Sequence, residues 1–385
     1  MGRFRDALAG PGLAAIAEVK RRSPSAGDLR PGADPAQLAA DFQRAGAAAV
    51  SILVDERFAG SFDDLRAARH AAQLPLLAKG FFREVSELVE LEEAGADAVL
   101  LLLRDLDDRE AQGLLDAADR LGLDALVEAH DEDELDRAVA LGADLIGLNA
   151  RDLGTFRIDR EAQLELVTRA AGDRVVIAES GIGSRAQAAE AELAGADAVL
   201  VGSTLMRAAD PAAKLEELLG RPLVKVCGLT RQEDADVAAE AGADLAGFIL
   251  AKESPRRAER ILEVPKTMLS VAVLVGEPQE TTADLVQLYE RENGHRARNG
   301  ALLRDGRQVA TVLDQPWEDR DPDHLAKAAA TGGRVVLAGG LSPENVGDAI
   351  AAVRPWAVDA SSSLEVEPGI KDHDRIRAFV EAARC

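Results

Sequence analysis

The sequence predicts an α/β protein of two tandem TIM-type (β/α)8 barrels, the second truncated or distorted in its middle, in units three to five. Eight apolar runs follow one another in the first half of the chain, with stretches rich in Ala, Glu and Arg between them. Strands that alternate with helices require a parallel sheet, and eight such units close into a barrel. A new strand series starts after Arg221-Pro222, so we expect domains at residues 1–220 and 221–385.

The strands of the first barrel are expected where apolar runs end in polar residues. These runs are residues 13–20, 48–55, 74–80, 98–103, 125–130, 145–151, 175–180 and 198–203. In a TIM-type barrel the C-terminal ends of the strands form one rim, and catalytic residues lie there. The residues expected at this rim are Glu18, Lys20, Lys79, Glu128, Asn149, Arg151, Glu179, Ser180, Gly202 and Ser203.

Two lysines favour a chemical interpretation of this rim. The chain has 45 basic residues, of which eight are lysines, so arginine is its usual surface cation. Lys20 and Lys79 nevertheless end apolar strands, where a compact ammonium differs in chemistry from a guanidinium. The alternative, that charged residues only mark where strands meet water, does not explain this choice of cation.

Composition excludes several classes of function. The net charge of -23 argues against a nucleic-acid partner, but a few cations and helix N-termini can still hold a small phosphate. Two cysteines and five histidines show no ligand spacing, so we expect no metal and no cofactor. No apolar run is long enough to span a membrane and the N-terminus has no signal-peptide core, so we expect a cytoplasmic protein without a membrane partner.

The first motif is AEVKRRSPSAG, residues 17–27. Glu18 and Lys20 are two apart on one strand and therefore point to the same side, and Ser23 follows near the barrel mouth. Further motifs follow at later strand ends: AKGF (78–81), LVEAHDEDEL (126–135), IGLNARDL (146–153), AESGI (178–182) and VGSTLM (201–206). With these six ordered motifs, residues 4–219 resemble indole-3-glycerol phosphate synthase.

The resemblance implies a reaction that closes an indole ring on an anthranilate-derived ribulose phosphate, with loss of carbon dioxide and water. Such a reaction needs a general acid and a general base. The resemblance implies Lys79 as the acid and Glu128 as the base, with Glu18 and Lys20 sharing the dehydration and orientation. It assigns substrate binding to the other rim residues: Asn149 and Arg151 for the anthranilate end, Glu179 and Ser180 for sugar hydroxyls, Gly181, Gly202 and Ser203 for phosphate, and Ser23 at the mouth.

Two departures from the family pattern carry expectations. The family usually has Lys-Asp-Phe where this chain has Lys79-Gly80-Phe81, so we expect a lysine that is less anchored or differently tuned. The family also carries a longer helical extension over the barrel mouth. Here only residues 3–10 precede the first strand, so we expect a looser substrate lid.

The second half begins with a strand that ends at Cys227. A lone cysteine there is either a buried small hydrophobe or a reactive thiolate. Its neighbours favour the second interpretation, because four segments resemble phosphoribosylanthranilate isomerase, the enzyme of the preceding step in tryptophan synthesis. They are KVCGLTRQEDA (225–235), GFILAKESPRR (247–257), LAGGLSPENV (337–346) and VDASSSLEVEPGIKD (358–372).

This second resemblance implies an Amadori rearrangement, in which an acid opens an aminoribofuranose ring and a base removes the C2 proton. It implies Cys227 as the base and, as the aspartate that ends strand six, Asp314 as the acid. It assigns the anthranilate carboxylate to Arg256. The remaining substrate-binding candidates, most of them for phosphate, are Gly339, Gly340, Asp359, Ser362 and Ser363.

The middle of the second half departs from the family. Residues 223–385 are fewer than the roughly 200 that form the low end for such a barrel. Residues 281–294 are predicted as an amphipathic helix that stops at Asn293-Gly294; a rival interpretation makes Asp284–Tyr289 the fourth strand and removes the third helix instead. Residues 301–314 predict a hairpin around Asp305-Gly306, which would break the parallel strand order.

Three functional hypotheses follow. The leading one is a bifunctional enzyme of tryptophan biosynthesis that acts on small phosphorylated anthranilate derivatives, with tryptophan synthase as a candidate downstream partner. The second keeps the synthase and makes the C-terminal half a non-catalytic stabilising module. The third, another sugar-phosphate isomerase, has to treat six ordered motifs as coincidence.

Overall fold

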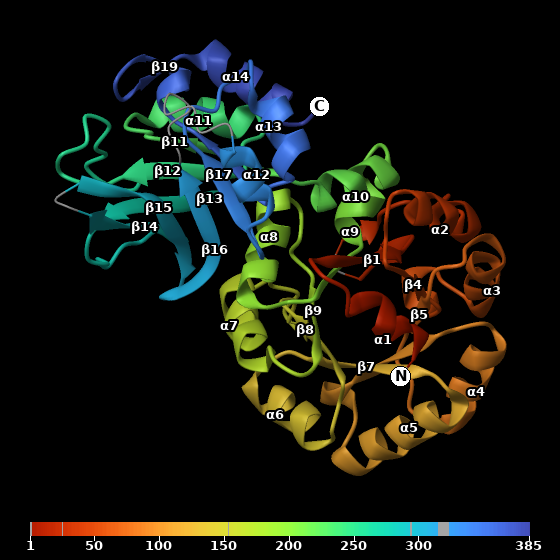
Figure 1. Ribbon diagram of the computed structural model, residues 1–385. Helices are drawn as coiled ribbons and strands as arrows, with labels where there is room; N and C mark the ends of the chain where they lie inside the picture. Colours follow the sequence, from red (N-terminus) through yellow and green to blue (C-terminus); the bar gives the residue numbers. More distant parts are fainter. Residues whose placement is uncertain (1, 25, 153, 293–294, 315–322) are drawn as a thin grey trace. The chain divides into compact units, whose positions relative to one another are not determined.

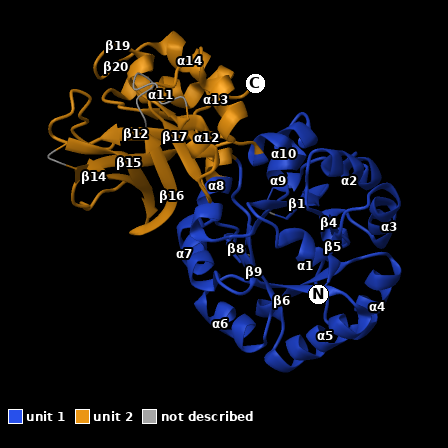
Figure 2. Cartoon of the chain, in the orientation of Figure 1, with its two compact units in different colours: residues 1–183, 188–219 blue, residues 184–187, 220–385 orange. Residues whose placement is uncertain are grey.

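The computed structural model of the protein describes residues 2–24, 26–152, 154–292, 295–314 and 323–385. The chain divides into two compact units (Figure 2). Unit 1 comprises residues 1–183 and 188–219, and unit 2 comprises residues 184–187 and 220–385. Each unit is built around a closed barrel of eight strands.

The barrel of unit 1 has the expected parallel architecture. Its strands follow the order β1-β10-β9-β8-β7-β6-β5-β4, and every neighbouring pair is parallel. The eight strands are β1 (Ala14–Val19), β4 (Ala49–Leu53), β5 (Leu76–Lys79), β6 (Ala98–Leu102), β7 (Asp124–Ala129), β8 (Leu145–Asn149), β9 (Val175–Glu179) and β10 (Ala198–Val201). A short antiparallel pair, β2 (Arg22–Ser23) with β3 (Gly27–Asp28), follows β1.

Helices surround this barrel, as Figure 1 shows. Several begin where an aspartate side chain accepts a hydrogen bond from the first turn, as Asp107 does from the backbone N–H of Glu110 and Asp131 from that of Glu134. The helices are α2 (Pro35–Arg44), α3 (Phe62–Ala71), α4 (Val85–Glu93), α5 (Asp108–Leu121), α6 (Glu132–Ala140), α7 (Arg160–Ala170), α8 (Arg185–Ala194), α9 (Ser203–Arg207) and α10 (Pro211–Leu219).

The N-terminal helix α1 (Arg3–Leu8) closes the end of the barrel that lies away from the rim. Phe4 and Leu8 are fully buried among the apolar side chains of the barrel interior. The backbone N–H groups of Phe4 and Arg5 both donate to Asp124, the first residue of β7, over 3.0 Å. This segment is therefore a plug at the N-terminal end of the strands, and its packing has no bearing on a lid over the mouth.

Unit 2 is also a closed eight-stranded barrel, but one strand runs against the others. β15 is antiparallel to both neighbours, and all other neighbouring pairs are parallel. The strands, in spatial order, are β11 (Leu223–Cys227), β12 (Leu245–Ile249), β13 (Leu269–Val275), β14 (Leu285–Glu292), β15 (His295–Arg304), β16 (Arg307–Asp314), β17 (Val335–Ala338) and β18 (Ala357–Ala360). A small antiparallel pair, β19 (Glu365–Glu367) and β20 (Ile370–Lys371), follows.

The helix predicted over residues 281–294 is wrong, and the rival interpretation as a fourth strand is confirmed. Leu285, Gln287 and Tyr289 are buried while the residues between them are partly exposed, which is the two-residue period of a strand. The helical prediction grouped Leu285, Leu288 and Tyr289 on one face, a set too short to separate the two periods. The predicted stop at Asn293-Gly294 lies outside the described residues.

The predicted hairpin is confirmed. Asp305 and Gly306 join β15 to β16 with φ values of 49° and 75°, and a tight two-residue hairpin of this kind requires positive φ at both positions. In the described part of the chain no α-helix lies between β12 and β16. The α-helices of this unit that are described in full are α11 (Gln232–Glu240), α12 (His324–Ala329), α13 (Val346–Val353) and α14 (His373–Ala382).

The plug formed by α1 gives a test of the packing of unit 1. Phe4→Ala should lower the free energy of unfolding of unit 1 by about 3 kcal/mol or more, because a fully buried aromatic ring would leave a cavity. Segment-resolved amide hydrogen exchange in β1 and β7 measures this change. Asp6→Ala, an exposed position on the same helix, should change it by about 0.5 kcal/mol or less. Equal effects of the two substitutions would contradict the plug.

Candidate active sites

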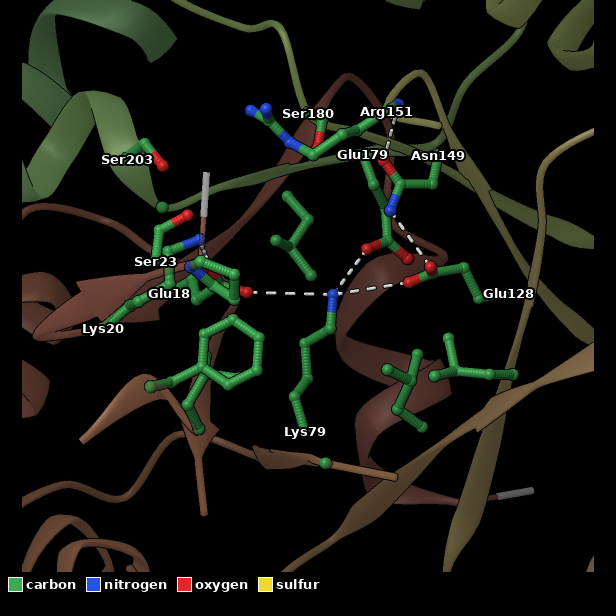
Figure 3. A pocket seen from close by; sticks show the side chains of 18 of the residues that line it. Glu18, Lys20, Ser23, Lys79, Glu128, Asn149, Arg151, Glu179, Ser180 and Ser203 are labelled. Carbon is green, nitrogen blue, oxygen red and sulfur yellow. Dashed lines mark hydrogen bonds and ion pairs between the residues drawn. The ribbon is translucent and has the colours of Figure 1, made fainter. Parts of the chain in front are cut away.

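A cavity of about 760 Å³ opens at the C-terminal rim of unit 1. Every rim residue singled out from the sequence of this half contributes to its lining (Figure 3). They come from the ends of β1, β5, β7, β8, β9 and β10 and from the segments that follow. These residues are Glu18, Lys20, Ser23, Lys79, Glu128, Asn149, Arg151, Glu179, Ser180, Gly181, Gly202 and Ser203.

Lys79 lies at the centre of the site, surrounded by three carboxylates (Figure 3). Its Nζ is 2.6 Å from Glu179 Oε2, 3.6 Å from Glu128 Oε2 and 3.7 Å from Glu18 Oε2. Burial alone would lower the pKa of Lys79, but the three carboxylates outweigh it and raise that pKa above its usual range. Lys79 is therefore an ammonium, able to donate a proton.

The Lys79 side chain is held in place although residue 80 is a glycine. The three carboxylates hold the ammonium without a neighbouring aspartate. A Cβ added at Gly80 would lie 2.7 Å from Cζ of Phe82, so a larger residue there would require that ring to move. The expectation of a less anchored lysine is therefore not met.

Glu179 is the most deeply buried of the three carboxylates, with 1% of its surface exposed. Burial raises its pKa to about 8; Lys79 opposes this shift, while Glu128 and Glu18 add to it, because three carboxylates share one ammonium. Its Oε1 has no hydrogen-bond partner within the described residues. This oxygen lies against the backbone of β8, since a Cβ added at Gly147 would be 2.2 Å from it.

Glu128 is held by a second layer of polar groups. Asn149 Nδ2 donates to its Oε1 over 3.0 Å, and His130 Nε2 is 3.2 Å from the same oxygen. Burial raises the pKa of Glu128, but Lys79, His130 and Asn149 outweigh it and lower that pKa to about 2. Glu128 is therefore an ionised carboxylate at neutral pH, as a general base must be.

His130 is a site residue that the sequence analysis missed. Its Nδ1 is 3.0 Å from Glu134 Oε2, so the ring lies between two carboxylates. Burial opposes the charged form, but Glu128 and Glu134 raise the pKa of His130 to about 10. The signal was present, because His130 stands two residues after Glu128, the same spacing that linked Glu18 to Lys20.

The remaining groups of the rim are arranged around this core. Lys20 Nζ bonds Glu18 Oε1 over 2.5 Å, and Asn149 Oδ1 accepts from the backbone N–H of Arg151 over 2.9 Å. Gly202 permits a close approach, since a Cβ there would lie 2.2 Å from Glu18 Oε1. The site therefore combines two ammonium groups, an ionised base and a guanidinium within one cavity.

Unit 2 has a cavity of about 450 Å³ at the corresponding rim. All residues singled out in this half line it, so Cys227 at the end of β11 and Asp314 at the end of β16 face the same space. These residues are Cys227, Arg256, Asp314, Gly339, Gly340, Asp359, Ser362 and Ser363.

Lys225, which the sequence analysis passed over, is the buried cation beside Cys227. Its Nζ bonds Gln287 Oε1 over 2.7 Å and Asp359 Oδ2 over 2.8 Å, and it lies 3.5 Å from Cys227 Sγ. Burial raises the pKa of Cys227, with Lys225 opposing the shift. Cys227 is thus buried, as one interpretation had it, and also lies next to an ammonium that stabilises a thiolate.

Hydrogen bonds continue from this cluster to Asp314. Gln287 Nε2 donates to the Tyr289 hydroxyl over 2.7 Å, and that hydroxyl donates to Asp314 Oδ2 over 3.0 Å. Arg296 Nη1 bonds the same oxygen over 2.6 Å. Gln287, Tyr289 and Arg296 carried no sequence signal, because residues 281–294 were predicted as a helix and β15 was not expected to reach the site.

The guanidinium of Arg256 is already paired with a carboxylate of the protein. Its Nε donates to both carboxylate oxygens of Glu365 over 2.9 and 2.8 Å, and Glu365 also accepts from Lys371 Nζ over 2.8 Å.

Among the residues that the structure describes, no group of three or more His, Cys, Asp or Glu side chains could hold a metal ion. Within the same residues no helix is both long and apolar enough to cross a membrane.

Comparison with known proteins identifies the chain. The family model described as indole-3-glycerol phosphate synthase matches residues 2–218. The chain belongs to the indole-3-glycerol phosphate synthase family. A second model, described as N-(5'phosphoribosyl)anthranilate (PRA) isomerase, matches residues 319–382.

Relatives of two kinds are similar to this synthase-family chain. The indole-3-glycerol phosphate synthase of Nocardioides sp. is 48% identical over 221 residues, 57% of this chain and 84% of that protein. The multifunctional tryptophan biosynthesis protein of Schizosaccharomyces pombe is 32% identical over 453 residues, 96% of this chain and 59% of its own length. A solved phosphoribosyl anthranilate isomerase from Thermotoga maritima is 28% identical over 42% of this chain and 98% of its own, with a TM-score of 0.33.

These matches confirm the bifunctional hypothesis. The chain is an indole-3-glycerol phosphate synthase and a phosphoribosylanthranilate isomerase of tryptophan biosynthesis. Its substrates are small phosphorylated compounds of the anthranilate pathway. The chain spans about three fifths of the length of the multifunctional relatives it matches.

The raised pKa of His130 makes a prediction about stability. A histidine whose pKa rises from 6.5 to about 10 on folding stabilises the folded state fully below pH 6.5, and this contribution is lost as the pH rises to about 10. His130→Gln should therefore destabilise unit 1 by about 2 kcal/mol or more at pH 6, with the difference from the wild type shrinking toward pH 10.

Urea denaturation between pH 6 and 10 measures this difference. His70→Gln, at an exposed position of α3, serves as the control and should show no such trend. A difference between His130→Gln and the wild type that does not change with pH would exclude a protonated His130.

Proposed function

We propose that residues 1–220 are the synthase domain and residues 221–385 the isomerase domain of this enzyme. The observation that carries the synthase assignment is that Lys79 Nζ lies 3.6 Å from Glu128 Oε2 in one cavity at a barrel rim. We propose further that the enzyme works in the cytoplasm, and that tryptophan synthase is its downstream partner. The pathway assignment supports both.

In the synthase reaction the substrate is carboxyphenylamino-deoxyribulose 5-phosphate. Lys79 donates a proton to the ketone oxygen while the aromatic carbon that bears the carboxylate bonds to the carbonyl carbon. Carbon dioxide then leaves, and its electron pair restores the aromatic ring. The new hydroxyl departs as water after protonation, and Glu128 takes the proton whose loss completes the indole double bond. Glu18 and Lys20, which form an ion pair of 2.5 Å, share the dehydration.

The substrate-binding roles follow the chemistry of each group. Arg151 supplies a guanidinium for the anthranilate end, with Asn149 fixing its backbone. Glu179 and Ser180, which both line the cavity, take sugar hydroxyls. Backbone N–H groups near the ends of β9 and β10 take the phosphate. The residues of that phosphate site are Gly181, Gly202 and Ser203, with Ser23 beside them at the mouth.

The acid-base pair is tested by two substitutions. Lys79→Met and Glu128→Gln should each slow indole formation by about 100-fold or more, because each removes one proton-transfer group. Steady-state kinetics measure the rates, and circular dichroism checks the fold. Lys214→Met, on α10 and away from the cavity, is the matched control and should retain the wild-type rate. Wild-type rates in either site variant would remove that residue from the mechanism.

In the isomerase reaction Asp314 protonates the ring oxygen of the aminoribofuranose. The bond from C1 to that oxygen breaks as the anthranilate nitrogen forms a double bond to C1, and Cys227 removes the C2 proton to give the enaminol that becomes the ketose. The support is that Cys227 and Asp314 line one cavity, with Lys225 beside the sulfur. Phosphate binds at the rim of the last two strands, and the candidate ligands there are Gly339, Gly340, Ser362 and Ser363, with Asp359 positioning Lys225.

The isomerase pair is tested by separating the two activities. Cys227→Ala and Asp314→Asn should each abolish isomerisation of phosphoribosylanthranilate, followed by anthranilate fluorescence, and leave indole formation from its own substrate unchanged. Cys385→Ala removes the other, exposed cysteine and should change neither activity. Full isomerisation by Cys227→Ala would identify another base, and a wild-type chain without isomerisation would make unit 2 a non-catalytic module.

A further inference from the structure

The base proposed for the isomerase, Cys227, is a buried thiol. A thiol removes a proton only after it has lost its own, so the base has to be a thiolate. Cys227 is 5% exposed, and burial opposes the charged form of the sulfur. The charged groups around the sulfur therefore decide whether it can act.

The first cation beside the sulfur is Lys225, on the same strand. An ammonium has three N–H donors. Its Nζ lies 2.7 Å from Gln287 Oε1, 2.8 Å from Asp359 Oδ2 and 3.5 Å from Cys227 Sγ, so two donors serve oxygens and the third faces the sulfur. A glycine of β12 makes room for the pair, since a Cβ added at Gly247 would be 2.7 Å from the sulfur and 2.9 Å from the Cε of the lysine.

The second cation is Lys371, at the end of β20. Its side chain is fully buried, and its Nζ donates to the backbone oxygen of Ser361 over 3.0 Å and to Glu365 Oε1 over 2.8 Å. Ser361 lies against the residue after Cys227, since a Cβ added at Gly228 would be 2.8 Å from Ser361 Oγ. The β19–β20 pair therefore brings a second ammonium to the side of the barrel that carries the cysteine.

The pairing of these groups leaves an excess of positive charge. Asp359 balances the charge of Lys225. Glu365, by contrast, accepts from both Lys371 and Arg256, so two cations share one carboxylate. Among these groups one positive charge is left uncompensated, and that is the sign of charge that stabilises a thiolate.

The sulfur and the two lysines influence one another's protonation. Burial raises the pKa of the Cys227 thiol, and Lys225 and Lys371 oppose that shift. Burial lowers the pKa of Lys371, and Glu365 and the sulfur oppose that shift in turn. Tyr289 lines the same cavity, but burial raises the pKa of its hydroxyl well above the usual range, so it adds no charge.

We propose that Lys225 and Lys371 together hold Cys227 as a thiolate, so that two lysine–carboxylate pairs set the strength of the isomerase base. Neither lysine is among the described residues that line the cavity, so both are positioning residues that act through the sulfur. This inference rests on the proposed isomerase site. It gives the β19–β20 pair a function, which is to deliver the second ammonium.

The test measures the ionisation of Cys227 directly. In a Cys385→Ala background Cys227 is the sole cysteine, and its rate of alkylation by iodoacetamide, followed by mass spectrometry across the pH range, reports the thiolate fraction. Lys225→Met and Lys371→Met each remove a cation. Each should move the midpoint of the alkylation profile to higher pH and slow alkylation about 10-fold or more below that midpoint.

Two further variants should shift the midpoint the other way. Asp359→Asn and Glu365→Gln each remove a carboxylate that balances one of the lysines, so both should move the midpoint to lower pH. A loss of structure would expose the thiol and give every variant the same ordinary profile. Opposite shifts within each pair can therefore come only from charge, and the carboxylate variants decide the question even if a lysine variant does not fold.

A control and a second readout make the outcome specific. Lys252→Met, at an exposed position, should keep the midpoint. The acid limb of kcat/KM for isomerisation should move with the midpoint, because that limb reports the base of the free enzyme. A midpoint that moves in Lys225→Met but in neither Lys371→Met nor Glu365→Gln would overturn the inference and leave the isomerase assignment intact. An acid limb that stays fixed while the midpoint moves would overturn Cys227 as the base.

Discussion

The synthase site depends on one constraint, that three buried carboxylates share the ammonium of Lys79. Buried charges are stable only when they are paired and hydrogen-bonded, so Glu18, Glu128 and Glu179 require this lysine as much as it requires them. The four groups end β1, β7, β9 and β5, so they meet only if the barrel closes in register. The pairing leaves an excess of negative charge, which Lys20 reduces; the pKa of Glu179 is raised, whereas the pKa values of Glu18 and Glu128 are lowered. Proton donor and proton acceptor therefore coexist within a few ångströms.

Unit 2 shows how a barrel can lose crossover helices and keep its site. A parallel strand needs a crossover of a dozen or more residues, whereas an antiparallel hairpin needs only two. β14, β15 and β16 follow one another as antiparallel neighbours, and two reversals of direction bring β16 back parallel to β17. Asp314 therefore ends its strand at the rim, as it would after two complete strand-helix units. The same reversal brings the first residues of β15 to the rim, where a regular barrel has only strand ends.

The site of unit 1 could be predicted from the sequence because local patterns mark its residues. Each rim residue ends an apolar run, and parallel order alone brings such ends together, so Lys79 and Glu128 could be placed in one cavity without knowledge of distances. The hairpin was equally local, since Asp305-Gly306 specifies the turn. The structure of residues 281–294 was not a local property: Leu285, Leu288 and Tyr289 fit a helical period, Leu285 and Tyr289 also fit one face of a strand, and only the neighbouring strands decide. The place of Arg296 at the rim follows only once residues 285–292 are known to be a strand. His130 and Lys225 were overlooked, although each stands two residues from a predicted site residue, Glu128 and Cys227 respectively.

The two sites use a buried lysine in different ways. Lys79, the proposed proton donor, faces three carboxylates that balance its charge. Lys225 faces one carboxylate, Asp359, and a sulfur at 3.5 Å. With Asp359 already balancing its charge, Lys225 offers Cys227 only partial compensation, and burial keeps the pKa of the thiol raised. Formation of a thiolate at Cys227 is therefore costly, whereas the lowered pKa of Glu128 keeps that carboxylate ionised at neutral pH.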